Sequence, residues 1–335
     1  MKRFFAILIV LAACLALFCV TAGAEDIPND VTWEEIGSES QLRALGTGTH
    51  YAKVTKNITV ENSSYIEIYG TLTLDLNGCT ITYAPPVSSC DGKSMFYCED
   101  TSNFTLMDSK GGGKLTFAHL GETYEGTGTE AGQTLYARAC AVAVNKNSTF
   151  TMKGGTIENF GNTSAYGAAV HVITTTAKQA PTFHMEGGTI QNCKSLLAGT
   201  GMYRGSGAAV HIRGANSTFN MTGGTIQNCS SEGNGGAIFA WGAHVSITGG
   251  TISGCTSQKN GGAIYAAELS GPAYAKNGPA EITIGGSAKI SGNKASGTYS
   301  YGGAIYAENA AITMTGGTIE NNGAQNGGNE LFLTG

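Results

Sequence analysis

Aromatic and imidazole rings recur at one position of a repeated four-residue word. The word reads Gly-Ala-Ala-Val or Gly-Gly-Ala-Ile and begins at Gly167, Gly207, Gly235, Gly261 and Gly302. Because alternate residues of a strand face opposite sides, the last residue of each word points inward and the next one outward. The outward residues are His171, His211, Phe239, Tyr265 and Tyr306, with Arg213 and Trp241 one outward position further along. We expect an exposed column of flat side chains that stacks on sugars or on a partner's apolar edge.

The same column has a structural interpretation that needs no ligand. Rings on neighbouring strands stabilise each other by roughly 0.2 to 1 kcal/mol per pair. A loop folded over the column, such as residues 267–279, would have the same effect. A metal site formed by His171 and His211 lacks further ligands in the sequence. Ligand binding and packing therefore stand as two alternatives for this column.

Cysteine recurs at a second repeated position, three residues after an isoleucine that recurs in every repeat. Successive repeats place Phe160, Cys193, Cys229, Cys255, Asn293 and Asn322 there. If they stack in register, they form an interior ladder in which Cys acts as a small apolar residue. The Asn side chains would hydrogen-bond to the backbone of the turn and to the Asn at the same position of the neighbouring repeat. Zinc is the alternative, but it needs four converging ligands, whereas these sulfurs would lie in a line without C-x-x-C spacing. We expect packing here, with no metal or other cofactor.

Two further cysteines are candidates for a disulfide. Cys90 and Cys98 are close enough in sequence to close a short loop, and the sequence leaves this pairing open. It leaves the states of Cys79 and Cys140 open as well.

Acidic residues are too scattered to indicate catalysis. Lyases and hydrolases that act on polysaccharides need grouped carboxylates to hold Ca²⁺ or to act as acid and base. No Asp follows Asp108, and the later Glu residues occupy scattered repeat positions. We therefore assign no catalytic residue. Asp75, Asp91, Asp100 and Asp108 fit loops and solvated strand faces, where a structural cation is an open alternative.

These positions require a fold that stacks one repeat on the next. A second word, such as Phe150-Thr-Met-Lys-Gly-Gly-Thr-Ile157, recurs with its Gly-Gly pair beginning at residues 154, 187, 223, 249, 285 and 316. Constant words at a variable spacing indicate fixed strands joined by loops that tolerate insertions. We predict an all-β, right-handed, single-stranded parallel β-helix with about three strands per coil. A β-propeller would need antiparallel hairpins, which the pattern does not show.

Composition supports a folded protein that does not bind nucleic acid. Glycine accounts for 50 of the 335 residues and charged residues for 13 %, against ordinary shares of roughly 7 % and about 25 %. Glycine has no three-residue period and only 6 prolines occur, which excludes collagen. A hydrophobic share of 41 % can form a core, and a net charge of −5 argues against nucleic acid.

The first 24 residues are typical of a signal peptide. Lys2 and Arg3 precede an apolar run over residues 4–20, and Ala22-Gly23-Ala24 fits a cleavage site. The alternative is a lipoprotein box at residues 11–14, with Cys14 acylated. No second apolar stretch of about 20 residues follows, so we expect no integral membrane span. The prediction is an exported protein, extracellular or on the cell surface.

The mature chain divides into a cap and a long repeat region. Residues 25–46 form the predicted cap segment, with a short helix over residues 32–45 started by a capping box of Thr32 and Glu35. Residues 47–335 form the β-helix, with irregular coils over 47–140 and regular repeats over 141–335. The sequence stops within what reads as a further coil, so either more chain follows or the last rung pairs with another partner.

Particular runs of sequence resemble a known class of proteins. The segments Leu72–Ile81 and Phe104–Gly113, together with the Gly-Gly-Ala-Ile words, resemble bacterial extracellular right-handed β-helix repeat proteins of the pectate-lyase-like fold. The Gly-Gly-Ala-Ile word and the run from Ile319 to Asn322 also resemble repeats of polymorphic outer-membrane proteins and autotransporter passengers. The resemblance covers about residues 30–335.

This resemblance implies a fold more sharply than a function. It implies an adhesin-like scaffold that binds glycans or surface partners, here along the aromatic column. The same fold hosts polysaccharide lyases and glycoside hydrolases, which form the alternative function, and inert structural spacers, which form the second alternative. The ligand, the oligomeric state and the means of cell attachment stay open.

Overall fold

The structure is a computed structural model that describes most of the chain. The described residues are 30–89, 93–125, 134–136, 139–162, 169–174, 176, 178–196, 205–269 and 278–335. Residues 33–335 form one compact unit. The signal peptide predicted over residues 1–24 lies outside the described residues, as do Cys90 and Asp91. Among the described residues, no helix has the length and apolar character needed to cross a membrane.

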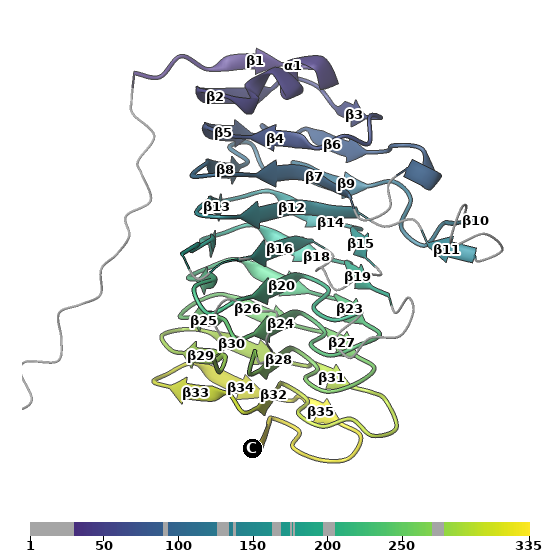
Figure 1. Ribbon diagram of the computed structural model, residues 1–335, viewed down its shortest axis with the longest axis vertical. Coiled ribbons are helices and arrows are strands. Elements are labelled where there is room, and N and C mark those ends of the chain that lie inside the picture. Colours follow the sequence, from purple (N-terminus) through teal and green to yellow (C-terminus); the bar gives the residue numbers. More distant parts are fainter. Residues whose placement is uncertain are drawn as a thin grey trace, which may run out of the picture. The chain divides into compact units, whose positions relative to one another are not determined.

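Two long parallel sheets run through this unit (Figure 1). Sheet A contains, in spatial order, β1 (Glu34–Ile36), β2 (Thr49–Val54), β5 (Thr71–Asp75), β8 (Asn103–Met107), β13 (Thr149–Met152), β17 (Thr182–Met185), β21 (Thr218–Met221), β25 (His244–Ile247), β29 (Glu281–Ile284) and β33 (Ala311–Met314). Sheet B contains β3 (Ile58–Val60), β6 (Thr80–Tyr83), β9 (Lys114–Phe117), β14 (Thr156–Glu158), β18 (Thr189–Gln191), β22 (Thr225–Gln227), β26 (Thr251–Ser253), β30 (Lys289–Ser291) and β34 (Thr318–Glu320). In both sheets, spatial order follows chain order.

Sheet C combines a ladder of longer strands with a ladder of two-residue strands. The longer strands are β4 (Ile66–Ile68), β7 (Lys93–Cys98), β12 (Ala139–Asn145), β16 (Val170–Ile173), β20 (Val210–Arg213), β24 (Ile238–Trp241), β28 (Ile264–Ala267), β32 (Ile305–Glu308) and β36 (Leu331–Thr334). The short ones are β15 (Gly161–Asn162), β19 (Lys194–Ser195), β23 (Ser230–Ser231), β27 (Thr256–Ser257), β31 (Lys294–Ala295) and β35 (Gly323–Ala324). One antiparallel pairing, between β12 and β15, joins the two ladders.

The chain therefore passes through sheets A, B and C in turn and then repeats the circuit one level further on. This arrangement is a parallel β-helix, as the repeats predict. Each regular coil carries four strands rather than three, because a two-residue strand such as β19 precedes the longer strand of sheet C. A small antiparallel hairpin, β10 (Thr123–Glu125) with β11 (Thr134–Tyr136), and a short 3₁₀ turn, η2 (Val87–Ser89), lie among the irregular early coils.

The interior is built from like residues stacked over like. Phe104, Phe150, Phe183 and Phe219 occupy one register position of sheet A, and their successive ring centroids are 5.1, 5.0 and 4.9 Å apart. All four rings are buried. The glycine pair inside each word makes the bend between sheets A and B possible: Gly188 has a φ of 76°, and a Cβ there would lie 2.7 Å from the Gly155 carbonyl oxygen.

The N-terminal cap differs from its prediction. The helix α1 spans only Glu39–Arg43 and continues into a 3₁₀ turn, η1 (Ala44–Gly46). Its N-cap is Ser38, whose hydroxyl accepts a hydrogen bond from the Gln41 N–H at 3.3 Å, so the predicted capping box of Thr32 and Glu35 is wrong. Glu35 instead lies in β1, because pairing with β2 satisfies the backbone of this segment.

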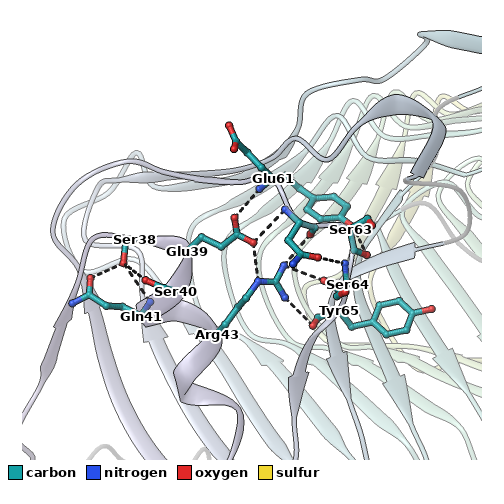
Figure 2. Close-up of polar contacts among 11 residues, drawn as sticks. Ser38, Glu39, Ser40, Gln41, Arg43, Glu61, Ser63, Ser64 and Tyr65 are labelled. Atoms are coloured by element: carbon teal, nitrogen blue, oxygen red, sulfur yellow. Dashed lines mark hydrogen bonds and ion pairs between the residues drawn. The ribbon is translucent and has the colours of Figure 1, made fainter.

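Two paired side chains of α1, Glu39 and Arg43, fix the cap onto the first coil through hydrogen bonds to its backbone (Figure 2). The Arg43 guanidinium donates to the Glu39 carboxylate at 2.7 Å and to the backbone carbonyls of Asn62, Ser64 and Tyr65. The Glu39 carboxylate in turn accepts the N–H groups of Glu61 and Asn62. The helix therefore satisfies backbone groups of the loop between β3 and β4, at the end of the stack where a neighbouring coil would otherwise do so.

Candidate functional site

The predicted column of rings is present on sheet C. His171, His211, Phe239, Tyr265 and Tyr306 pair in register on β16, β20, β24, β28 and β32. Successive ring centroids are 5.4, 4.9, 5.4 and 5.3 Å apart. Phe332 on β36 continues the column, with its centroid 5.6 Å from that of Tyr306. The repeated words do not predict Phe332, because the word before it, Gly-Gly-Asn-Glu-Leu, has one extra residue.

The predicted exposure of this column is wrong for four of its five rings. Phe239 is fully buried, and His211, Tyr265 and His171 retain 1 %, 3 % and 7 % of their accessible surface. The backbone of a neighbouring coil lies close to this column at Gly207, where a Cβ would meet the Phe239 Cβ at 2.8 Å. These four rings are packing elements in this structure, and a large ligand cannot reach their faces.

Burial also decides the charge of the two imidazoles. Burial, with a smaller contribution from the nearby Arg213 charge, lowers the pKa of His211 to about 3 against the raising effect of a hydrogen bond with the Ser206 carbonyl. The pKa of His171 is lowered well below its ordinary value by burial and then by His211 and Arg213. Both rings are therefore neutral at pH 7. Within the described part of the chain, no group of His, Cys, Asp and Glu is placed to hold a metal ion.

Arg213 and Trp241 sit one outward position further along, as predicted, and both are half-buried. The Arg213 guanidinium lies 6.0 Å from the centre of the Trp241 ring, in cation–π contact. The indole N–H donates to the Glu268 carbonyl at 2.8 Å, and the ring packs against the cluster of Phe239 and Tyr265. The Trp241 side chain is therefore held both by the hydrogen bond of its indole N–H and by the packing of its ring.

Of the stacked rings from His171 to Phe332, Tyr306 and Phe332 at the later end of the column stay partly exposed. We call Tyr301, Tyr306 and Phe332 the ring patch; all three are partly exposed. The centroids of Tyr301 and Phe332 are 4.6 Å apart, and Tyr306 stacks on Phe332 from the neighbouring strand. Tyr299, two residues before the patch, is 81 % exposed.

Polar groups border the ring patch. The Glu308 carboxylate, half-exposed on β32, accepts the hydroxyl hydrogen of Tyr265. The Tyr306 hydroxyl lies 3.5 Å from the Thr334 hydroxyl, and the Tyr301 N–H donates to the Asn260 side chain at 3.0 Å. The patch therefore offers flat apolar faces beside a carboxylate and a hydroxyl.

The cysteine position forms the interior ladder that the repeats predict. Cys193, Cys229 and Cys255 are buried free thiols in three consecutive coils. Asn293 and Asn322 continue the position as an amide ladder: the Asn322 side-chain carbonyl accepts from both the backbone and side-chain N–H of Asn293, at 2.9 Å each. Of the proposed disulfide pair, Cys98 is buried and Cys90 lies outside the described residues.

The early aspartates hold turns together. Asp75 is 1 % exposed rather than solvated, and its carboxylate accepts from the Asn77 N–H and from the N–H and hydroxyl of Ser109. The Asp108 carboxylate accepts from the Gly78 and Gly113 N–H groups at 2.7 Å each. These carboxylates are occupied by backbone donors, which explains their presence without a cation or a substrate.

Asp100 and Glu158 are paired with lysines. Lys146 lies 2.7 Å from the Asp100 carboxylate, and Lys114 lies 2.9 Å from that of Glu158.

Comparisons of the chain with protein-family models, with curated proteins and with solved structures find no match.

Proposed function

We propose that this protein is an exported, adhesin-like scaffold that is displayed at the cell surface and binds glycans through its ring patch. The signal-like leader and the resemblance to extracellular β-helix repeats support export and display. The observation that carries glycan binding is the set of three partly exposed rings in which Tyr301 and Tyr306 each contact Phe332.

The geometry of the patch suits a sugar. Aromatic faces provide apolar contact area for the C–H face of a sugar ring, and a neighbouring carboxylate or hydroxyl accepts hydrogen bonds from sugar hydroxyls. Glu308 and Thr334 are placed for this second role. Because Tyr306 and Phe332 lie on paired strands, their orientation is set before a ligand arrives, which lowers the entropic cost of binding.

A glycan array tests this function. The mature protein is compared with a variant in which Tyr301 and Tyr306 are both replaced by alanine. We expect the wild type to retain a defined set of glycans, and the variant to bind them about tenfold more weakly or worse, since two ring contacts are each worth roughly 0.5–1.5 kcal/mol. Tyr69→Ala is the matched control: Tyr69 is 45 % exposed on an early coil, and its replacement should leave binding unchanged.

Other outcomes would select the alternatives. Equal binding by the wild type and the double variant contradicts the ring patch as the site. Absence of binding to every glycan favours a structural spacer. Release of shortened sugar products during incubation favours the polysaccharide lyase or glycoside hydrolase.

A further inference from the structure

The three ladder cysteines lie directly over one another. The residues that flank each cysteine along the chain pair in register from coil to coil. Two residues before the cysteines, Gln191, Gln227 and Ser253 pair in sheet B; one residue after them, Lys194, Ser230 and Thr256 pair in sheet C. The Ser230 N–H also donates to the Cys193 carbonyl, and the Thr256 N–H to that of Cys229, both at 2.9 Å. Adjacent backbone positions of this kind are about 4.7–4.9 Å apart.

The three thiols share one orientation. Each sulfur donates to the carbonyl two residues earlier, at 3.3 Å for Cys193, 3.4 Å for Cys229 and 3.5 Å for Cys255. Cys229 has one ladder cysteine on each side, Cys193 and Cys255, between flanking residues that pair in register. Cys229 is therefore the central member of a continuous row of three sulfurs.

We propose that Cys229 forms a disulfide with one of its two ladder neighbours, which joins two consecutive coils covalently. The backbone spacing of the ladder falls inside the Cα separation of roughly 4.4–6.8 Å that disulfides span. Cys229 bonds Cys193 or Cys255 but not both, so one of the three thiols is always left over. The row therefore allows two alternative disulfides, 193–229 and 229–255, each of which joins two consecutive coils.

The reaction is a thiol–disulfide exchange with a small-molecule disulfide such as oxidised glutathione. The Cys229 thiolate attacks one sulfur of that disulfide, and the other sulfur leaves as a thiolate that takes up a proton. The neighbouring cysteine then attacks the Cys229 sulfur of the mixed disulfide and displaces the second small thiol. Two protein thiols are oxidised and one small disulfide is reduced to two thiols.

Burial dictates when this exchange proceeds. It raises the pKa of the Cys229 and Cys255 thiols well above the ordinary value, so little reactive thiolate forms in the closed stack. The bond therefore forms while the chain folds or while a coil is open. Export would supply the oxidising surroundings in the cell, but the reaction itself does not depend on glycan binding.

The test is refolding of the mature protein from denaturant in a glutathione redox buffer. Remaining thiols are alkylated under denaturing conditions, and the peptides are mapped by mass spectrometry. We expect one ladder disulfide in the wild type, found as 193–229, as 229–255 or as a mixture. Cys193→Ser should retain the 229–255 bond, Cys255→Ser should retain the 193–229 bond, and Cys229→Ser should retain neither.

Two results overturn the proposal. One is full alkylation of all three ladder thiols in refolded wild type; the other is a bond between Cys193 and Cys255 that survives in Cys229→Ser. Far-UV circular dichroism shows which variants have folded, and only the folded variants enter the comparison. Cys229→Ala is a second replacement at the central position, for the case in which Cys229→Ser does not fold. Because the buffer supplies the oxidant, failure here leaves the glycan experiment unaffected.

Discussion

Acidification is expected to destabilise the wild-type protein through its buried imidazoles, and His211→Phe should remove much of that effect. The folded-state pKa of His211 is about 3, below the ordinary value of 6.5. Between these two values the unfolded chain binds more protons than the folded one, so stability is complete above pH 6.5 and falls as the pH is lowered. The slope is about 1.4 kcal/mol per pH unit, or about 3 kcal/mol between pH 6.5 and pH 4.5.

Urea unfolding at a series of pH values measures this effect. Phenylalanine suits the position because Phe239 already stacks on His211, with centroids 4.9 Å apart. The difference in unfolding free energy between variant and wild type should grow steadily as the pH falls from 6.5. His171 and Arg213 face the same ring and stay in both proteins; because burial is the largest cause of the His171 shift, the titration of His171 contributes to both profiles. Parallel pH profiles for the two proteins would show that His211 is not buried in neutral form.

Replacing Phe183 by alanine is expected to cost about 3 to 5 kcal/mol of unfolding free energy. The ring is fully buried between Phe150 and Phe219, with centroids 5.0 and 4.9 Å away. Alanine would leave a cavity in the middle of the ladder and remove two ring contacts at once. Denaturant unfolding followed by far-UV circular dichroism gives the change.

The neighbouring residue provides the control for this substitution. Thr182 lies on the same strand with its side chain on the outer face, so Thr182→Ala should change stability by less than about 1 kcal/mol. Similar losses for the two variants would mean that Phe183 does not occupy the interior.

The repeated words predict the interior of this protein well, because parallel in-register pairing places identical positions on top of one another. Phe150, Phe183 and Phe219 share a word in the sequence and a ladder in the structure. The cysteine position follows the same rule, since a fixed number of residues separates it from the isoleucine of each repeat. Periodicity is informative wherever the backbone repeats without insertion.

The features that sequence missed depend on contacts outside this periodicity. The burial of His211 and Phe239 depends on contacts between coils, such as the approach of Gly207 to Phe239, which the alternation along one strand does not show. Asp75 is buried because Ser109, more than thirty residues later, supplies donors to it. Two-residue strands such as β19 (Lys194–Ser195) are too short to show an alternating pattern.

The start of the cap helix was missed for a different reason. Thr32 and Glu35 fit a local capping pattern, but pairing of β1 with β2 satisfies more of the backbone than an extra helical turn would. Tyr306 of the ring patch was predicted, but the other two members were not, because Tyr301 lies before the repeated word and Phe332 follows an altered one. Neither residue belongs to a pattern that could be recognised from one sequence.

Distances between spin labels on the outer face of sheet A test the in-register stack most directly. Thr313 serves as the common site, and His184, Thr151 and Thr105 lie four, five and six rungs away from it. With about 4.8 Å per rung, double electron–electron resonance should give backbone separations of about 19, 24 and 29 Å, increasing by an equal step for each rung. Separations that fail to increase with the number of rungs, or that increase by a clearly different step, would contradict the parallel β-helix on which every proposal above depends.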